Sequence, residues 1–559
     1  MENKNLVWEF ANKVRGRVPE EMVVEFVISF AYDYCNRNNL IPGSDTELLN
    51  IAGESLERIP SDLKFDLENM FVNLSFNEIK GIVSSSLFMK QRFMDNSNDN
   101  LLALASELLE LSNGDSLFDL GSGLGSFLIG TLNLAQERSI ELSALYGVEI
   151  NYNQHALSKM VLEIFTFDSS VKSKINYANI LTDKYELAYN KGFVYPPLGM
   201  KLMGNDLNYI SIFKNIVLST RNSVEWIFID KLLNNLKGDD ARAVALVTGR
   251  TLFSAVDRDY RNEILMTGML EGIIELPQGI VDNTSVKLFL LIFSKNNKNV
   301  RLFDASMFSS KRKFNEPIKV DVKQIIDFYY GKDVAKKDVS DLTDLSNWIP
   351  STALLAIDSP KNGVKLSEVA HVFTGSQYTV RNFQEAVTDK NTGYKLLTSS
   401  DIQDGLIDES NLQNIDNKDG KLDKFALEFN DVIITSKSSK VKIAVIDFEP
   451  KDKIIVTGGM IIARVDKSRL NPTFLKVFLE SDQGQLILKS IQKGISIITI
   501  NATELSNIII PLPQIDVQYT IAKKYNRKLS SLMALKAEIL KIEDELKNFY
   551  YEEIEEVLS

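Results

Sequence analysis

The sequence has little of the chemistry that metal sites and many hydrolases need. Its 559 residues include one cysteine, Cys35, and two histidines, His155 and His371. A single cysteine permits neither an internal disulfide nor a cysteine-based zinc site, and two histidines leave little for metal or histidine-base chemistry. We therefore predict no bound metal, and many hydrolase classes are excluded.

Long apolar runs are also missing. The chain has no stretch of about 18 consecutive apolar residues, the length that a membrane helix needs. The first five residues, Met1 to Asn5, lack the basic-then-apolar pattern of a signal peptide. Membrane insertion and secretion are disfavoured, and we expect a cytoplasmic protein.

Proline and glycine are scarce, with 13 and 28 residues, beside 44% hydrophobic and 25% charged residues. This composition excludes a disordered or collagen-like chain, and the length predicts about two to four domains. The net charge of −12 argues weakly against a polyanionic partner. The net charge says nothing about how charges are distributed locally, so a basic DNA-binding cleft is not excluded.

Apolar patterning divides the first part of the chain in two. Residues 1–90 carry broad apolar stripes at helical spacing, which predicts a helical domain. From about residue 100 to 295, short apolar runs alternate with helical segments, and this predicts an α/β domain with a largely parallel sheet. The expected strands cover residues 116–119, 144–149, 243–247, 272–276 and 289–293.

A polar stretch precedes a second unit, which begins near residue 360. This unit has short strands with turn signals at Asp404-Gly405 and Gly458-Gly459. From Leu529 to Phe549, apolar residues recur every three or four positions, the pattern of a long helix that packs against another helix. The domains that we predict cover residues 1–90, 91–345, 346–520 and 521–559.

The most informative short segment is Phe118-Asp119-Leu120-Gly121-Ser122-Gly123-Leu124-Gly125-Ser126-Phe127. Its alternate glycines let the backbone pass tightly under a ligand at a helix N-terminus. Glu149, at the end of the next expected strand, is placed to accept both hydroxyls of a ribose. Dinucleotide enzymes and S-adenosylmethionine (SAM) methyltransferases share this order, and Asp119 before the glycines favours the methyltransferases.

The chain here resembles the modification subunit of type I restriction-modification systems, a family of N6-adenine DNA methyltransferases. The resemblance runs from about residue 90 to 295. It is carried by residues 119–127, Glu149, Asn179-Ile180-Leu181, 195–201 and the segments from 243 to 293. It implies a Rossmann-like domain that binds SAM through Asp119, Gly121, Gly123, Gly125, Phe127, Glu149 and Asn179.

Residues 360–530 resemble one half of the specificity subunit of the same systems. The residues that carry this resemblance are Val364 to Val369, Thr374 to Ser376, Ser400 to Ile402 and Ile509 to Gln518. The resemblance implies an α+β target-recognition domain that reads double-stranded DNA. Lys437, Lys440 and Lys442 are candidates for contacts with the DNA backbone, although they could equally lie on an exposed strand edge.

The catalytic tetrapeptide departs from the family. The family uses Asn-Pro-Pro-aromatic, in which the amide oxygen and a proline carbonyl hold the exocyclic amine of a flipped adenine while the ring stacks on the base. The matching residues here are Tyr195, Pro196, Pro197 and Leu198. A phenol reaches a different place from an amide, and leucine has no π-face. The family's Phe-x-Thr-Pro-Arg stretch, which closes over the cofactor, keeps only its phenylalanine in residues 92–98.

Several functions are compatible with these observations. We favour an adenine-N6 DNA methyltransferase-like protein with a fused specificity domain, acting in restriction-modification or phage defence. A catalytically silent DNA-binding or SAM-sensing relative is the first alternative, and a nucleotide-binding oxidoreductase is a distant second. One recognition domain with one long helix predicts a homodimer through the C-terminal helix, and a separate restriction or defence subunit is a further candidate partner.

Overall fold

The computed structural model describes most of the chain. The described residues are 9–558 except 11, 15, 42, 44, 88–98, 184–186, 204–218, 282–285, 310–317, 319, 333, 345–346, 355–362, 377–384, 418–419, 438–440 and 493–498. The chain divides into two compact units, Met1–Leu354 and Leu355–Ser559. No helix of the described residues is long and apolar enough to cross a membrane.

Unit 1 begins with helices, as the sequence predicts. They are α2 (Val23–Arg37), α3 (Thr46–Glu57), α4 (Ser61–Phe71) and α5 (Phe76–Leu87). Each buries one apolar face, and in α2 that face includes Phe26, Val27 and Phe30. Cys35 lies in the same buried face. The core of these helices continues into that of the following α/β domain.

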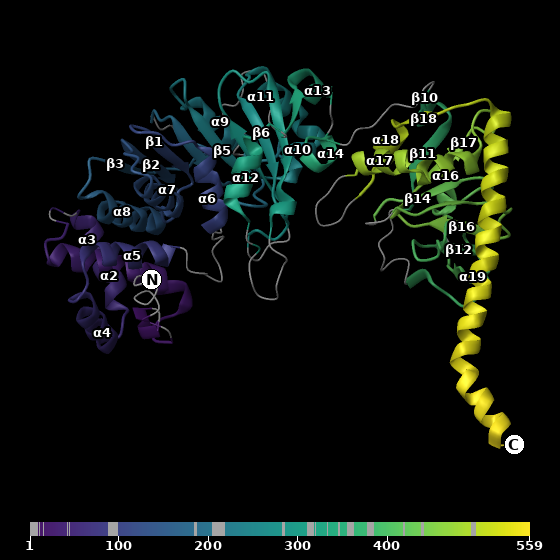
Figure 1. Cartoon of the computed structure of the whole chain (residues 1–559), viewed down its shortest axis with the longest axis horizontal. Helices are drawn as coiled ribbons and strands as arrows, with labels where there is room; N and C mark the ends of the chain where they lie inside the picture. The colour runs from purple at the N-terminus through teal and green to yellow at the C-terminus, as the bar shows by residue number, and fades with distance from the viewer. Residues whose placement is uncertain are drawn as a thin grey trace. The chain divides into compact units, whose positions relative to one another are not determined.

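A mixed sheet forms the centre of unit 1 (Figure 1). In the described residues its nine strands run in the order β3-β2-β1-β4-β5-β7-β6-β8-β9. They are β1 (Ser116–Leu120), β2 (Ala144–Glu149), β3 (Lys172–Tyr177), β4 (Lys191–Val194), β5 (Arg242–Thr248), β6 (Leu270–Glu275), β7 (Leu288–Phe293), β8 (Asn299–Asp304) and β9 (Ala335–Asp338). The first five strands in this order, β3-β2-β1-β4-β5, are parallel to one another, whereas β7 is antiparallel to β5 and β6. The five strands predicted from the apolar runs are confirmed.

Helices cover this sheet. They are α6 (Asp99–Leu108), α7 (Ser126–Glu137), α8 (Tyr152–Thr166), α9 (Glu225–Asn234), α10 (Gly249–Phe253), α11 (Arg258–Met266), α12 (Val322–Tyr329), α13 (Val339–Asp344) and α14 (Pro350–Ala353). Helices α7 and α8 pack on β1 to β3, and α9 packs on β4 and β5. Because each crossover helix follows a parallel strand, the loops after β1, β2 and β4 meet at one edge of the sheet.

The last segment of unit 1 reaches Leu354. The boundary expected between residues 345 and 346 stays a prediction. Helix α14 packs against β6 and β8. Buried Glu275, at the end of β6, accepts hydrogen bonds from the Ser351 N–H at 2.8 Å and the Ser351 hydroxyl at 2.9 Å. These contacts attach the α14 segment to the first unit.

Unit 2 contains three small sheets and a long helix. The strands are β10 (Gly363–Lys365), β11 (Ala370–Thr374), β12 (Tyr394–Leu397), β13 (Gln413–Asn414), β14 (Val432–Thr435), β15 (Ile443–Val445), β16 (Lys453–Val456), β17 (Met460–Val465) and β18 (Ile509–Pro511). The described sheets are β10-β18, β11-β17-β14-β15 and β13-β12-β16. The helices are α16 (Pro472–Glu480), α17 (Asp482–Ser490), α18 (Ala502–Ser506) and α19 (Ile515–Leu558). The predicted α+β class and the long C-terminal helix are confirmed.

Helix α19 is attached to unit 2 by its first half. Buried Gln518 accepts a hydrogen bond from the Asn471 N–H at 2.8 Å and donates to the carbonyls of Arg469 and Pro513. Further along, the Lys536 ammonium pairs with Asp404 at 2.7 Å. Beyond this pair the helix runs past the strands of its own unit (Figure 1).

Candidate active site

The predicted cofactor residues meet at the carboxyl edge of β1 to β4. The strand order changes direction at β1, because β2 and β3 lie on one side of it and β4 and β5 on the other. In open α/β sheets this switch point is where ligands bind. The ends of β1, β2, β3 and β4 bring Asp119, Glu149, Asn179 and Tyr195 to this edge.

The three glycines of the loop all have left-handed backbone. Gly121, Gly123 and Gly125 have φ angles of 96°, 52° and 83°, all in the left-handed region that favours glycine. The N–H groups of Gly121 and Ser122 both donate to the Val148 carbonyl, at 3.0 and 2.9 Å. The loop is thereby fixed to the end of β2, and α7 starts directly after Gly125.

Glu149 is a buried carboxylate that already binds two backbone N–H groups. It is 7% exposed. Its Oε2 accepts from the Gly123 N–H at 2.9 Å, and its Oε1 accepts from the Asn151 N–H at 2.7 Å. Since each carboxylate oxygen can accept more than one hydrogen bond, both retain capacity for a pair of hydroxyls. These two hydrogen bonds fix the orientation of the carboxylate before any ligand binds.

Sequence reasoning missed Asn151 and Gly147. The Asn151 side chain caps α8 by accepting from the Gln154 N–H at 3.1 Å, while its own N–H holds Glu149. A cap residue just after a strand-end acid could have revealed it. At Gly147, a Cβ atom would lie 2.7 Å from Ser122 Oγ, so a side chain there would displace the glycine loop. The strand pattern alone carries no sign of this close approach.

Asp119 is buried beside Glu149. The side chain is 4% exposed, and burial, reinforced by the negative charge of Glu149, raises the pKa of Asp119 to about 8. The carboxyl group is therefore mainly protonated at neutral pH in the ligand-free protein. A neutral acid at this position can donate as well as accept a hydrogen bond.

Because the Asp119 carboxyl group is buried, the free energy of unfolding should depend on pH. The folded pKa of about 8 lies above that of an unfolded aspartate, about 4. Between these values only the unfolded state ionises, so the free energy of unfolding should fall as pH rises from about 4 to about 8 and change no further above that. Urea denaturation at pH 5 and pH 8, followed by tryptophan fluorescence, should show a loss of about 3–4 kcal/mol. Asp119→Asn should largely remove this loss, and an equal loss in both proteins would contradict the assignment.

Asn179 and Phe127 have structural contacts of their own. The Asn179 Oδ1 accepts from the Leu181 N–H at 2.9 Å, and its N–H donates to Asp183 at 2.7 Å, so the turn after β3 is fixed. Phe127 is buried and stacks on Phe193 at a ring distance of 4.0 Å. Its side chain lies in the core beneath the glycine loop, where it supports the loop.

The degenerate tetrapeptide directly follows β4. Tyr195 and Leu198 are partly buried and pack against the core of unit 1, while Pro196 is buried and Pro197 is exposed. The Tyr195 hydroxyl oxygen is inaccessible to solvent. The tetrapeptide therefore lies at the predicted edge, but its aromatic ring is at its first position and a packed aliphatic side chain is at its last.

The three lysines proposed for DNA contact differ in their surroundings. Lys437 is exposed and its backbone pairs with Thr499. Lys440 lies outside the described residues. The Lys442 ammonium donates to the carbonyls of Ser399 and Ile402, at 2.8 and 2.9 Å. Lys442 thus fastens the 399–402 turn, and a phosphate would have to compete with these carbonyls.

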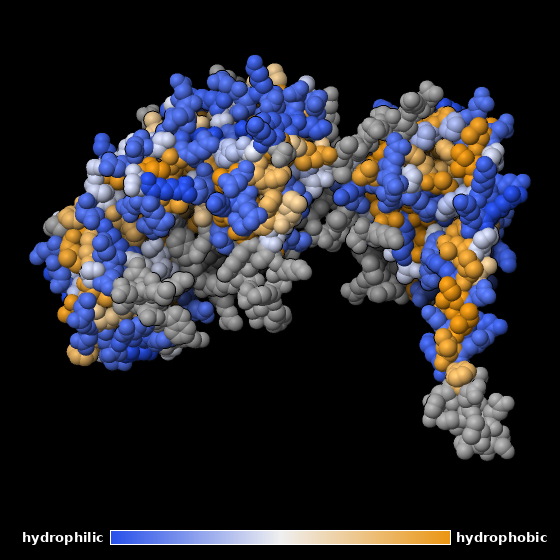
Figure 2. Space-filling view, viewed as in Figure 1, coloured by the Kyte–Doolittle hydropathy of each residue, from blue (hydrophilic) through white to orange (hydrophobic). Residues whose placement is uncertain are grey.

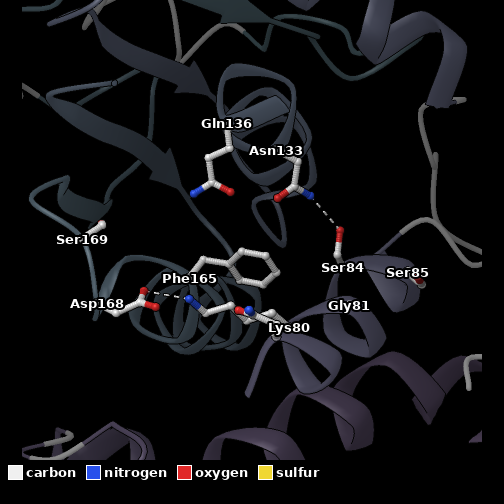
Figure 3. Close-up of a pocket in the computed structure, with 10 residues that line it drawn as sticks. Lys80, Gly81, Ser84, Ser85, Asn133, Gln136, Phe165, Asp168 and Ser169 are labelled. Carbon is white, nitrogen blue, oxygen red and sulfur yellow. Dashed lines mark hydrogen bonds and ion pairs between the residues drawn. The ribbon is translucent and has the colours of Figure 1, made fainter. Parts of the chain in front are cut away.

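A separate hollow lies at the other end of α7 (Figure 3). Its volume is about 530 Å³, and it is lined by α5, α7 and α8. The Asn133 side chain donates to Ser84 at 3.1 Å, and the Lys80 ammonium pairs with Asp168 at 2.7 Å. Figure 3 shows the Phe165 ring between these two pairs. The hollow is distinct from the glycine loop, which lies at the opposite end of α7.

Metal ligands do not gather in the described part of the chain. No group of three or more histidine, cysteine, aspartate or glutamate side chains there is arranged to hold a metal ion.

The comparisons with known proteins agree with this geometry. Residues 98–363 match the family model described as N-6 DNA Methylase. The methylase subunit of the type I restriction enzyme MpnII from Mycoplasma pneumoniae is 22% identical over 235 residues, which are 39% of this chain and 43% of that protein. The specificity subunit of the type I restriction enzyme EcoBI from Escherichia coli is 27% identical over 139 residues, 24% of this chain and 28% of that protein.

Among solved structures, the chain is similar to a type I restriction-modification methyltransferase subunit from Streptococcus thermophilus. It is 15% identical, with a TM-score of 0.43, and the match covers 61% of this chain and 97% of that one. The chain spans less than half of the length of the curated relatives that it matches.

Proposed function

We propose that this chain combines a SAM-binding adenine-N6 methyltransferase domain with a DNA-recognition domain, because residues 98–363 match the family model described as N-6 DNA Methylase. The observation that carries the proposal is the carboxylate of Glu149, held by the Gly123 and Asn151 N–H groups beside a left-handed glycine loop. Similarity to specificity subunits in the same chain supports the second half of the proposal.

The residues present fit SAM. The glycine backbone is not tightly enclosed, since a Cβ built at Gly121, Gly123 or Gly125 would make only an ordinary van der Waals contact, at 3.8 to 3.9 Å. Glu149 would hold the ribose hydroxyls, and the loop with Asp119 would face the methionine end. When bound, SAM supplies an electrophilic methyl group. The chain's contribution is to orient Glu149 in advance, so that little ordering is needed on binding.

Glu149→Ala should weaken SAM binding at least about 30-fold, since it removes charge-assisted hydrogen bonds and leaves the Gly123 and Asn151 N–H groups without their acceptor. Combining it with Gly123→Val should abolish measurable binding, because a β-branched residue rarely adopts the φ of 52° found there. Calorimetry with millimolar SAM measures both effects.

A matched control is Glu137→Ala, which removes an exposed glutamate at the far end of α7. It should bind like the unmodified chain. Absence of binding by the unmodified chain, or equal binding by the Glu149 variants, would remove the SAM assignment.

The target base is the second part of the proposal. We assign the edge after β4 to a flipped adenine, with Pro196 and Pro197 retaining the backbone of the family tetrapeptide. Tyr195 lacks the amide oxygen that would accept from the adenine amine, and Leu198 cannot stack on the base. These two residues favour a silent or very slow enzyme, whose roles would then be DNA binding and SAM sensing. Transfer of labelled methyl groups from SAM to genomic DNA of a host lacking the gene distinguishes an active enzyme from a silent one.

The third part of the proposal concerns partners. Unit 2 would read double-stranded DNA, and two copies of the chain would pair through α19. A separate restriction or defence subunit would complete the assembly. Apolar side chains of α19 from Leu532 to Phe549 support the pairing, because they are solvent-exposed in the single chain (Figure 2).

A further inference from the structure

Three exposed arginines lie around the loops after β5 and before α9. Arg250 is the second residue of α10, which starts directly after β5. Arg221 precedes α9, and Arg258 begins α11. All three are exposed. Since β5 is parallel to β4, the end of β5 lies at the same edge of the sheet as the proposed adenine site.

Buried hydrogen bonds bring the three together. Asp257 is fully buried and accepts from the Asn222 side chain at 3.1 Å, from the Ser223 N–H at 3.0 Å and from the Ser223 hydroxyl at 2.6 Å. The Asn222 side chain also donates to the Val256 carbonyl at 2.9 Å. Arg221 and Arg258 are each the next residue to a member of this network, which therefore holds their backbones close together.

Arg250 joins the same surface. One of its guanidinium nitrogens donates to the Arg221 carbonyl at 2.5 Å. The two loops and α10 are thus connected by direct hydrogen bonds. A buried aspartate with three donors is a rigid support, because its desolvation is offset only when all these hydrogen bonds form together.

The charges of this surface are mostly uncompensated. Among the described residues, none of the three arginines forms an ion pair with a carboxylate. The acidic residues next to them in sequence are Asp257, which is buried under the network, and Asp259, which is exposed. Buried Arg261, whose pKa is lowered by burial to about 10, adds a further positive charge behind the surface. A chain with a net charge of −12 therefore presents a local cluster of guanidinium groups.

We propose that Arg221, Arg250 and Arg258 bind the phosphate backbone of double-stranded DNA at the carboxyl edge of the sheet. The inference rests on the proposed function, which places DNA at this edge, and it adds a contact surface in unit 1 to the recognition domain in unit 2. Guanidinium groups match phosphate oxygens in shape and charge, and contacts of this kind position a duplex without reading its sequence. Their role would be to hold the strand beside the adenine site.

The test uses the double variant Arg221→Ala with Arg258→Ala in the full chain. Neither guanidinium makes a hydrogen bond in the described structure, so the fold should persist. Anisotropy of a labelled duplex of about 30 base pairs is measured at several salt concentrations. We expect binding to weaken about tenfold at low salt. The plot of the log of the association constant against the log of the salt concentration should become less steep by about two, since two phosphate contacts are lost. Arg250→Lys, which keeps the charge but not the fork of donors, should weaken binding less.

The matched control is Lys172→Ala with Lys174→Ala, which removes two exposed charges from edge strand β3. It changes the net charge equally and should leave the salt slope close to that of the unmodified chain. Equal slopes and affinities for the arginine and lysine variants would overturn this inference while leaving the proposed function intact. If the unmodified chain binds no duplex, the DNA part of the proposed function fails as well.

Discussion

Tyr195→Asn combined with Leu198→Phe should raise the rate of adenine methylation by at least about 100-fold. The change restores an amide oxygen that can accept from the adenine amine and a ring that can stack on the base. Both interactions act on the reacting base itself, so their effect should appear in kcat more than in KM. Single-turnover transfer of labelled methyl groups to unmethylated genomic DNA measures it.

Replacing Tyr195 should also lower the stability of unit 1. The Tyr195 ring is partly buried against the core and its hydroxyl oxygen is inaccessible to solvent, so an asparagine leaves space that the ring had filled. That loss is local and should cost about 1–3 kcal/mol of stability, which is a large fraction of typical domain stability but does not by itself unfold a large unit. The melting temperature of each variant is therefore measured beside its activity.

Tyr195→Phe with Leu198→Phe is the matched control, because it restores the stacking ring without the amide. It should gain far less than the asparagine variant. Should the unmodified chain already methylate adenine at ordinary enzyme rates, and the asparagine variant show no gain, then Tyr195 and Leu198 do not limit catalysis. In that case the backbone of Pro196 and Pro197 would have to position the adenine unaided.

Much of the site could be predicted because its chemistry is local in sequence. The glycines at 121, 123 and 125 permit left-handed backbone, and all three adopt it. Glu149 ends its strand, as the apolar run before it indicates, so its position at the sheet edge follows from topology. Strand β7, which is buried throughout, was recognisable as an uninterrupted apolar run.

The features that were missed depend on contacts between distant segments. Gly147 must stay without a side chain because Ser122, 25 positions earlier in the chain, lies against it. The α14 segment belongs to unit 1 because Ser351 binds Glu275, 76 positions earlier in the chain. The Lys442 ammonium donates to carbonyls about forty residues away, a contact that its sequence neighbours do not indicate.

The second large effect concerns the long helix. Apolar residues of α19 between Leu532 and Phe549 are 47–68% exposed; they are Leu532, Leu535, Ile539, Leu540, Ile542, Leu546 and Phe549. Figure 2 shows apolar surface running along this part of the helix. Six of the seven, all except Leu540, recur at steps of three and four residues, the spacing of a coiled-coil seam. A seam of this kind excludes water only against another helix, and a second copy of α19 provides a matching one.

Leu532→Glu with Ile539→Glu should therefore convert a dimer into a monomer. Each substitution would bury a carboxylate in the seam and place like charges near each other across the two-fold axis, so the dissociation constant should rise at least about 1,000-fold. Light scattering at tens of micromolar should give twice 63.0 kDa for the unmodified chain and 63.0 kDa for the variant. Ser530→Glu with Ala537→Glu, at exposed positions with the same spacing on the opposite side of the helix, is the control and should remain dimeric.

Pairing of identical helices also predicts the form of the DNA site. A two-fold axis relates the two recognition domains, so the preferred sequence should be an interrupted palindrome. The spacing between its halves should be uniform among bound sites, because Gln518 and the Lys536–Asp404 pair attach each domain to its own helix. Selection from a randomised duplex pool should return paired inverted half-sites for the unmodified chain and single half-sites for the Leu532 and Ile539 variant. Asymmetric sites from a chain that stays monomeric at tens of micromolar would instead assign the apolar seam to a different protein.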